Sequence, residues 1–233
     1  MLKAIVFDFD GVIVDSERLH YEAFVAIARG FELNFTYETY VQQYIGFDDR
    51  DAFRAMLSEQ GHRADEGRIS ALCCQKGQLF KDIIAKGVHM YPGVLEMIER
   101  AAATMPLAIA SGASRKDIAL ILDKLALCGC FDPVISADDV SRSKPDPETY
   151  VAAVRGLAQQ NPQLAIEPRN CLAIEDTSVG ILSARTAGLW TLGVAHTEPA
   201  EAIRAADRVV DSFAQVRFEA LQDWFGARRD EGP

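Results

Sequence analysis

The stretch KAIVFDFDGVIVDS, residues 3–16, decides the fold of this chain. It opens with a short apolar run that contains β-branched residues, lacks polar alternation and ends at Asp8. Such a run is typical of a strand that is buried on both faces of a parallel sheet. Asp8 and Asp10 follow this strand directly, and Gly11 permits a tight backbone turn after them. The stretch therefore predicts a buried strand that brings two carboxylates to one end of a sheet.

Further apolar runs and helical patterns alternate along the rest of the chain. The runs lie at 107–110, 133–136, 171–174, 190–194 and 208–210, the last as a short edge strand. Amphipathic helical patterns lie at 93–103, 115–127, 147–159 and 178–187. Strands that alternate with helices indicate an open parallel sheet with right-handed crossovers. We therefore expect a Rossmann-like α/β core.

One block breaks this alternation. From residue 16 to residue 90 the sequence has helical patterning, in which His20, Phe24 and Ile27 recur at helical spacing, and no run is typical of a strand. The simplest organisation is a discontinuous core domain, 1–15 with 91–233, and an inserted all-helical domain, 16–90.

Composition and charge limit the possible partners. The chain has 233 residues, with 24 Lys and Arg against 34 Asp and Glu, so its formal net charge is −10. Such a chain repels polyanions, so we expect no nucleic acid partner and no binding to anionic membranes. The odd number of cysteines, five, favours free thiols. No secretory segment and no apolar run of about 20 residues is present. We therefore expect a soluble, cytoplasmic protein.

Reactive groups follow the predicted strands, at the sheet edge where open α/β folds bind ligands. Ser111 and Gly112 come after the second strand, just before a helix whose N–H groups favour an anion. Lys144 lies in the loop Ser-Lys-Pro-Asp-Pro, and the pair Glu175 and Asp176 follows the fourth strand. Taken singly, these pieces are typical of turns, helix caps and surface charge. Their joint placement favours one site.

The residue types point to phosphoryl transfer. Crowded carboxylates require a cation, and a set of oxygen ligands suits Mg²⁺, which shares its coordination shell with a substrate phosphate. Asp8 is then a nucleophile that forms an aspartyl-phosphate, and Asp10 is the general acid and base. Lys144 and Ser111 contact the phosphate oxygens. The predicted ligand is a small phosphorylated metabolite.

Four motifs, in this order over nearly the whole chain, resemble those of the haloacid dehalogenase superfamily. They are residues 8–16, Ser111, Lys144-Pro-Asp-Pro, and residues 174–177. The resemblance is strongest to the branch of β-phosphoglucomutase and the phosphoglycolate-type phosphatases, whose helical cap domain follows the first motif.

This resemblance implies roles for the acidic residues. Mg²⁺ would be held by Asp8, by the backbone carbonyl of Asp10 and by Asp176, with Glu175 holding a metal-bound water. The second aspartate of the first motif implies phosphoryl transfer, because the dehalogenases lack this acid/base group.

The cap domain would supply substrate specificity, since the core recognises only a phosphate. The candidates are His20, Gly46, Arg50 and Lys76. The loop at Gly46 resembles a substrate loop in which an arginine holds a second phosphate, but Asp49 stands where that arginine is expected. The alternatives are a surface ion pair for Arg50, a half-buried helix position for His20 and a solvated helix position for Lys76.

Three functional hypotheses remain. The first is a Mg²⁺-dependent phosphatase of a sugar phosphate, and the second is a phosphomutase similar to β-phosphoglucomutase. The third is a non-catalytic sensor of sugar phosphates. A monomer and a homodimer are both compatible with the sequence.

Overall fold

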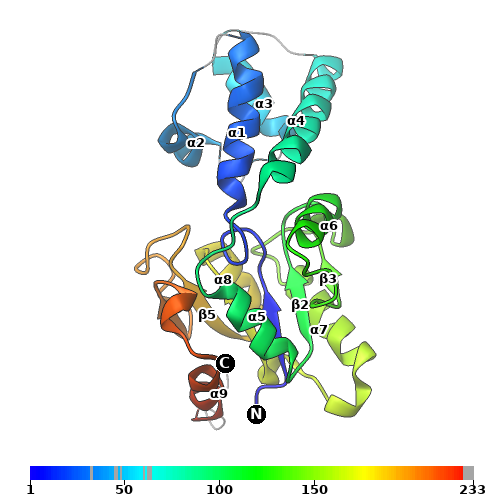
Figure 1. The fold of residues 1–233 in the computed structure, drawn as a ribbon, viewed down its shortest axis with the longest axis vertical. Coiled ribbons are helices and arrows are strands. Elements are labelled where there is room, and N and C mark those ends of the chain that lie inside the picture. The colour runs from blue at the N-terminus through cyan, green and yellow to red at the C-terminus, as the bar shows by residue number, and fades with distance from the viewer. Residues whose placement is uncertain (32–33, 45–46, 48, 60, 62–64, 228–233) are drawn as a thin grey trace. The chain divides into compact units, whose positions relative to one another are not determined.

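The computed structural model describes residues 1–31, 34–44, 47, 49–59, 61 and 65–227. The chain divides into two compact units, a core unit of Met1–Asp15 with His89–Pro233 and a cap unit of Ser16–Val88 (Figure 1). The chain re-enters the core unit two residues earlier than the sequence patterns suggest. The reason is that Met90 forms a bridge with Val14, and the Asp15 N–H donates to the carbonyl of His89 at 3.2 Å.

The described part of the core unit contains a six-stranded sheet with the order β3-β2-β1-β4-β5-β6. All neighbouring strands are parallel, which confirms the predicted α/β class. The strands are β1 (Ala4–Phe7), β2 (Leu107–Ala110), β3 (Val134–Ile135), β4 (Cys171–Glu175), β5 (Trp190–Val194) and β6 (Arg208–Val210). The strand order reverses between β1 and β4, and ligands bind at such a switch point, beyond the carboxyl ends of the strands.

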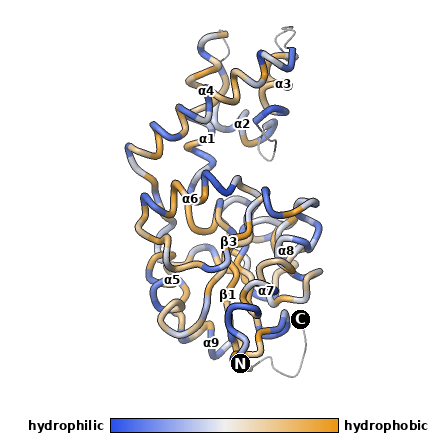
Figure 2. Tube along the Cα trace, turned by 90° about the vertical axis from the view of Figure 1, so that its right-hand side faces the viewer, coloured by the Kyte–Doolittle hydropathy of each residue, from blue (hydrophilic) through white to orange (hydrophobic). Residues whose placement is uncertain are grey.

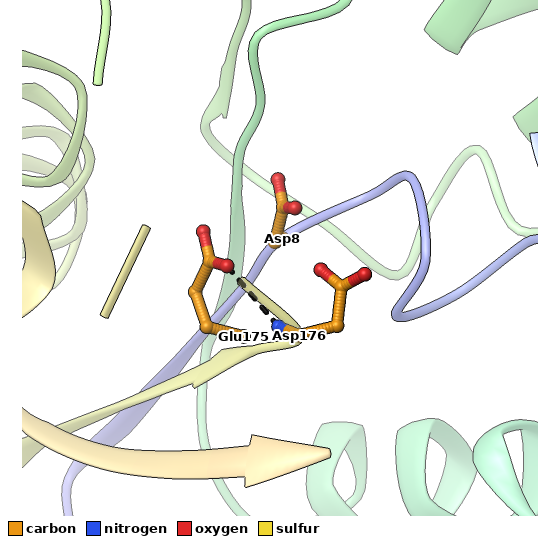
Figure 3. A group of neighbouring side chains, drawn as sticks. All are labelled: Asp8, Glu175 and Asp176. Carbon is orange, nitrogen blue, oxygen red and sulfur yellow. Dashed lines mark hydrogen bonds between the residues drawn. The ribbon is translucent and has the colours of Figure 1, made fainter. Parts of the chain in front are cut away.

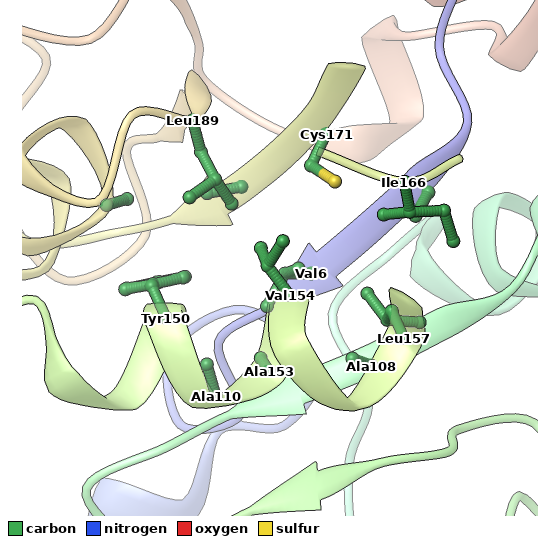
Figure 4. Close-up of a cluster of buried hydrophobic side chains, with 13 residues drawn as sticks. Val6, Ala108, Ala110, Tyr150, Ala153, Val154, Leu157, Ile166, Cys171 and Leu189 are labelled. Atoms are coloured by element: carbon green, nitrogen blue, oxygen red, sulfur yellow. The ribbon is translucent and has the colours of Figure 1, made fainter. Parts of the chain in front are cut away.

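Helices cover the sheet and explain its apolar strands. They are α5 (Val94–Ala102), α6 (Arg115–Lys124), α7 (Glu148–Gln160), α8 (Ser178–Thr186) and α9 (Phe218–Ala227). Figure 4 shows Val154 and Leu157 of α7 packed against one face of the sheet, near Val6 and Ala108. Small side chains such as Ala108 allow α7 to approach closely.

The opposite sheet face is buried as well. Successive residues of a strand point to opposite faces, so Phe7 points away from the face that carries Val6. The Phe7 ring meets Phe131 edge-on, with ring centroids 5.7 Å apart. Because both faces are covered, the trace of β1 is hydrophobic throughout (Figure 2).

The cap unit is helical over its described residues. Its α-helices are α1 (Ser16–Ala28), α2 (Tyr37–Gln43), α3 (Asp49–Glu59) and α4 (Glu66–Lys86). An aromatic cluster that includes Phe24, Tyr40 and Phe53 forms its core. Thr36 caps α2 and Asp65 caps α4, each by accepting a backbone N–H of the first turn. Among the described residues, no helix has both the length and the apolar character that a membrane crossing needs.

Candidate active site

Three buried carboxylates meet at the switch point of the sheet. Asp8 follows β1, and its N–H donates to the carbonyl of Ile174 in β4 at 2.9 Å, which holds it beside the end of β4. Figure 3 shows the Asp8 carboxylate between those of Glu175 and Asp176. Each of the three offers an oxygen, and these atoms lie within 4.8 Å of one another. The three residues are only 8%, 0% and 1% exposed.

Glu175 uses both of its oxygens on partners within the chain. Oε1 accepts from Lys144 Nζ at 2.6 Å and from the Tyr150 hydroxyl at 3.0 Å. Oε2 accepts from the backbone N–H groups of Asp176 and Thr177 at 3.1 and 3.2 Å, and from the Thr177 hydroxyl at 3.0 Å. This carboxylate is therefore fixed in place, and it fixes Lys144.

Lys144 supplies the positive charge of the cluster. Its Nζ lies 2.9 Å from Asp8 Oδ1 as well as 2.6 Å from Glu175 Oε1, and 5.1 Å from the centre of the Tyr150 ring. Burial acts against the charged amine, but the two carboxylates outweigh this effect and raise the pKa of Lys144. Lys144 is therefore a cation that joins the ends of β1 and β4.

One lysine does not balance three carboxylates. Burial, opposed by Lys144, raises the pKa of Asp8 to about 7. Burial and the neighbouring carboxylates raise the pKa of Asp176 well above its usual range. Asp176 Oδ1 is buried and has no hydrogen-bond partner among the residues that the structure describes. An all-oxygen donor set, an excess of buried negative charge and an unpaired carboxylate oxygen together fit a divalent cation such as Mg²⁺.

The loop that carries Asp10 passes directly against Asp176. Asp10 is half-buried, and its charge contributes to the raised pKa of Asp8. Gly11 has φ of +78°, and its N–H donates to the Val14 carbonyl at 2.9 Å. A Cβ at Gly11 would lie 1.8 Å from Asp176 Oδ2, so only glycine fits here.

The predicted anion loop is only partly free of protein partners. Ser111 is buried at the end of β2, and its Oγ accepts the Ala113 N–H at 2.9 Å. The N–H of Arg115, which begins α6, donates to Asp138 at 2.9 Å. We expected the N–H groups at the start of α6 to help bind an anion. This contribution is reduced, because the Asp138 carboxylate already accepts one of them. Ser111 and Gly112 stay the candidate phosphate contacts in this loop.

Two site residues escaped the sequence patterns. Tyr150 is fully buried on α7, where its ring faces Lys144 and its hydroxyl binds Glu175. One sequence feature could have indicated this role: the tyrosine lies on the apolar face of a helix that follows the Lys144 loop. A tyrosine buried there needs a hydrogen-bond partner for its hydroxyl. The second residue is Gly180 on α8. A Cβ at this position would lie 1.8 Å from Glu175 Oε1, so the glycine leaves the space that the Glu175 carboxylate occupies.

Two of the cap candidates lie together inside the cap unit. Lys76 is only 2% exposed, which excludes the solvated position considered for it. Its Nζ lies 2.6 Å from Asp49 Oδ1 and 2.6 Å from His20 Nδ1. The His20 ring stacks on Phe80 with centroids 4.2 Å apart. Burial and the Lys76 charge lower the pKa of His20 well below its usual range, so His20 is neutral.

Arg50 lies apart from that buried group. Its side chain donates to Glu66 Oε2 at 2.5 Å, and the two side chains are 45% and 65% exposed. This is the surface ion pair considered as an alternative, with Glu66 as the partner. Gly46 lies outside the described residues.

Comparisons with known proteins show which family the chain belongs to. CbbY from Rhodobacter capsulatus is 33% identical over 195 residues, which cover 81% of this chain and 83% of the relative. Validoxylamine A 7'-phosphate phosphatase from Streptomyces hygroscopicus subsp. limoneus is 28% identical over 220 residues, with 94% and 97% covered. The crystal structure of β-phosphoglucomutase from Clostridium difficile superposes with a TM-score of 0.78 at 24% identity, covering 97% of this chain and 98% of that one.

Further relatives include a fructose-1-phosphate phosphatase from Escherichia coli and a β-phosphoglucomutase from Bacillus subtilis. A family model described as haloacid dehalogenase-like hydrolase matches residues 5–194, which span β1 to β5 and so include every carboxylate of the cluster. The chain is therefore an enzyme of the phosphohydrolase or phosphomutase type, and it belongs to the haloacid dehalogenase-like hydrolase family.

Proposed function

We propose that this protein is a Mg²⁺-dependent phosphatase that hydrolyses a small sugar phosphate through a phosphorylated Asp8. The observation that carries the proposal is the contact of Asp8 with Lys144 beside the unpaired oxygen of Asp176. This contact supports a carboxylate nucleophile, a cation for the phosphate and a metal-binding oxygen at one switch point.

The residues that would hold Mg²⁺ are Asp8, Asp176 and, through its backbone carbonyl, Asp10. When bound, the ion supplies positive charge that lets a phosphate approach the carboxylates. The five hydrogen bonds to Glu175 favour a role in fixing Lys144, while a contact with a metal-bound water stays a prediction.

The chemistry then proceeds in two steps. An Asp8 oxygen attacks the phosphorus, the bond from phosphorus to the sugar oxygen breaks, and Asp10 donates its proton to that oxygen. Asp10 next takes a proton from water, which attacks the phosphorus and breaks its bond to Asp8. Lys144, Ser111 and Gly112 stabilise the charge on the phosphate oxygens throughout.

The cap unit favours hydrolysis over mutase activity. A mutase of this kind must hold a substrate with two phosphates, and the cap has to supply positive charge for the second one. Here Lys76 is paired with Asp49, and Arg50 is paired with Glu66. His20, Arg50 and Lys76 stay proposed substrate contacts, and their neutralised charges suit the hydroxyl groups of a monophosphate.

A phosphomutase is the second candidate, because the B. subtilis β-phosphoglucomutase aligns with 96% of this chain. Phosphate release from a panel of sugar phosphates with Mg²⁺ tests the first candidate. Asp8→Asn should abolish release, and Asp123→Asn, an exposed aspartate of α6, is the control that should retain it. Full turnover by Asp8→Asn would overturn the mechanism.

The mutase is tested with β-glucose 1-phosphate and glucose 1,6-bisphosphate as activator. Formation of glucose 6-phosphate without net phosphate release would replace the phosphatase proposal. Absence of turnover over the whole panel would support the sugar-phosphate sensor instead.

A further inference from the structure

The loop that follows β5 contacts the site at three separate points. His196, Thr197 and Glu198 are consecutive. His196 contacts the turn after Asp10, whereas Thr197 and Glu198 lie against the segment that contains Asp176 and Ser178. None of the three belongs to the four motifs on which the functional assignment rests. Their contacts all lie within the core unit.

His196 binds the turn after Asp10. Its Nδ1 lies 2.8 Å from the carbonyl oxygen of Gly11, and because a carbonyl only accepts, Nδ1 carries the proton. The ring stacks on Tyr91 with centroids 3.9 Å apart and an interplanar angle of 14°, and it meets Phe213 edge-on. The ring packing fixes the direction of this hydrogen bond, which holds the peptide next to the Asp10 carbonyl.

Thr197 faces Asp176 across Gly11. A Cβ placed on Gly11 would lie 2.7 Å from Thr197 Oγ1 and 1.8 Å from Asp176 Oδ2, so all three groups converge there. The Thr197 hydroxyl lowers the pKa of Asp176, against the larger effect of burial, and Asp176 Oδ1 has no hydrogen-bond partner among the described residues. Thr197 thus lies on the Oδ2 side of this carboxylate, and Oδ1 is the oxygen left for a cation.

Glu198 holds the segment just beyond Asp176. Its Oε2 accepts the Ser178 N–H at 3.0 Å, and its Oε1 accepts the Ser178 hydroxyl at 3.2 Å. Ser178 begins α8, where a carboxylate is favoured by the N–H groups of the first turn. The chain on the far side of Asp176 is therefore anchored to the same loop.

We propose that His196–Glu198 is a positioning segment that aligns the Asp10 carbonyl and the free oxygen of Asp176 for the divalent cation. It rests on the proposed function, because the cation site is part of that proposal. The segment connects the two metal-binding loops, which follow different strands, through the end of β5. Its residues are positioning residues and take no part in the bond changes.

The first test compares Thr197→Val with Thr197→Ser. The valine variant keeps the shape but loses the hydroxyl, and the serine variant restores the hydroxyl. Mg²⁺ affinity is measured by titration calorimetry without substrate, and phosphate release is measured as a function of Mg²⁺. We expect the valine variant to bind Mg²⁺ at least about tenfold more weakly, with the serine variant close to wild type.

The second test separates the two contacts of His196. His196→Phe keeps the stacking on Tyr91 but loses the donor, whereas His196→Asn keeps a donor close to Nδ1 but loses the ring. Weaker Mg²⁺ binding by the phenylalanine variant than by the asparagine variant supports the proposal. Glu201→Gln is the matched control, because Glu201 is exposed and pairs with Arg204 in the same loop.

The outcomes are distinguishable from a failure of the proposed function. Wild-type protein that binds Mg²⁺ and releases phosphate, together with unchanged Mg²⁺ affinity in Thr197→Val and His196→Phe, overturns the positioning segment alone. Equal loss of thermal stability in all variants without a change in Mg²⁺ affinity does the same. Wild-type protein that neither binds Mg²⁺ nor releases phosphate overturns both proposals.

Discussion

Lys144 Nζ lies 2.9 Å from Asp8 Oδ1, although the two residues are separated by 136 positions in the sequence. This contact joins the loop before α7 to the end of β1. It places a cation on the proposed nucleophile, and Glu175 holds that cation from the other side. Lys144 lowers the pKa of Asp8 but does not offset the larger effect of burial.

Removal of the Lys144 charge should inactivate the enzyme. In Lys144→Met the carboxylates of Asp8 and Glu175 lose their buried counter-charge, which costs about 3–5 kcal/mol of stability. Phosphate release should fall by about 10²–10³-fold, as for the loss of one preorganised charge-stabilising donor. Steady-state kinetics and urea unfolding measure both effects. Lys116→Met, at an exposed position of α6, should change neither.

Stability without metal should fall as the pH rises. The pKa of Asp8 is about 7 in the folded chain, against the ordinary value of 3.8 expected in the unfolded chain. Between pH 3.8 and pH 7 the folded state therefore binds more protons than the unfolded state. The stabilisation is complete below pH 4 and is lost as the pH rises through 7. Mg²⁺ should therefore raise the melting temperature more at pH 8 than at pH 5. Asp8→Asn should flatten the metal-free slope, and an unchanged slope in that variant would contradict the assignment.

Two glycine-to-alanine substitutions within helices should change the stability of the protein in opposite directions. In Gly180→Ala the new Cβ would lie 1.8 Å from Glu175 Oε1, which displaces the carboxylate that fixes Lys144. We expect loss of stability and of phosphate release. In Gly77→Ala, within α4, no described residue other than the adjoining turns of the helix has an atom within 4 Å of the new Cβ. That variant should be more stable by about 0.5–1 kcal/mol, with unchanged activity. Thermal melts compare the two.

Asp49 should control the discrimination between one phosphate and two. Asp49→Asn leaves the charge of the buried Lys76 without its carboxylate partner, so a second anionic group becomes better tolerated. The ratio of kcat/KM for fructose 1,6-bisphosphate to that for fructose 1-phosphate should rise about tenfold, which corresponds to about 1.4 kcal/mol. Asp51→Asn makes the same charge change on α3, at a residue paired with Arg54. An equal ratio in both variants would show that Asp49 has no special role.

Much of the fold and of the site follows from local sequence. The apolar runs of β1, β2, β4 and β5 lack alternation because both faces of the sheet are covered, and this property is visible along a few residues. The parallel order then brings the ends of β1 and β4 together. Asp8 and the pair Glu175 and Asp176 could therefore be predicted to meet before any distance was known.

Only the tertiary structure decided which partner each of those groups binds. Three contacts depend on residues from separate segments. Both oxygens of Glu175 accept hydrogen bonds from protein donors, Tyr150 faces Lys144, and His196 binds Gly11. The same holds for Lys76, whose helical spacing is equally compatible with solvent and with the buried pair it forms with Asp49. A local pattern specifies which side chains reach a sheet edge or a helix face. The partner that satisfies each buried charge is chosen by the packing of distant segments, because burial and hydrogen bonding are properties of the folded chain.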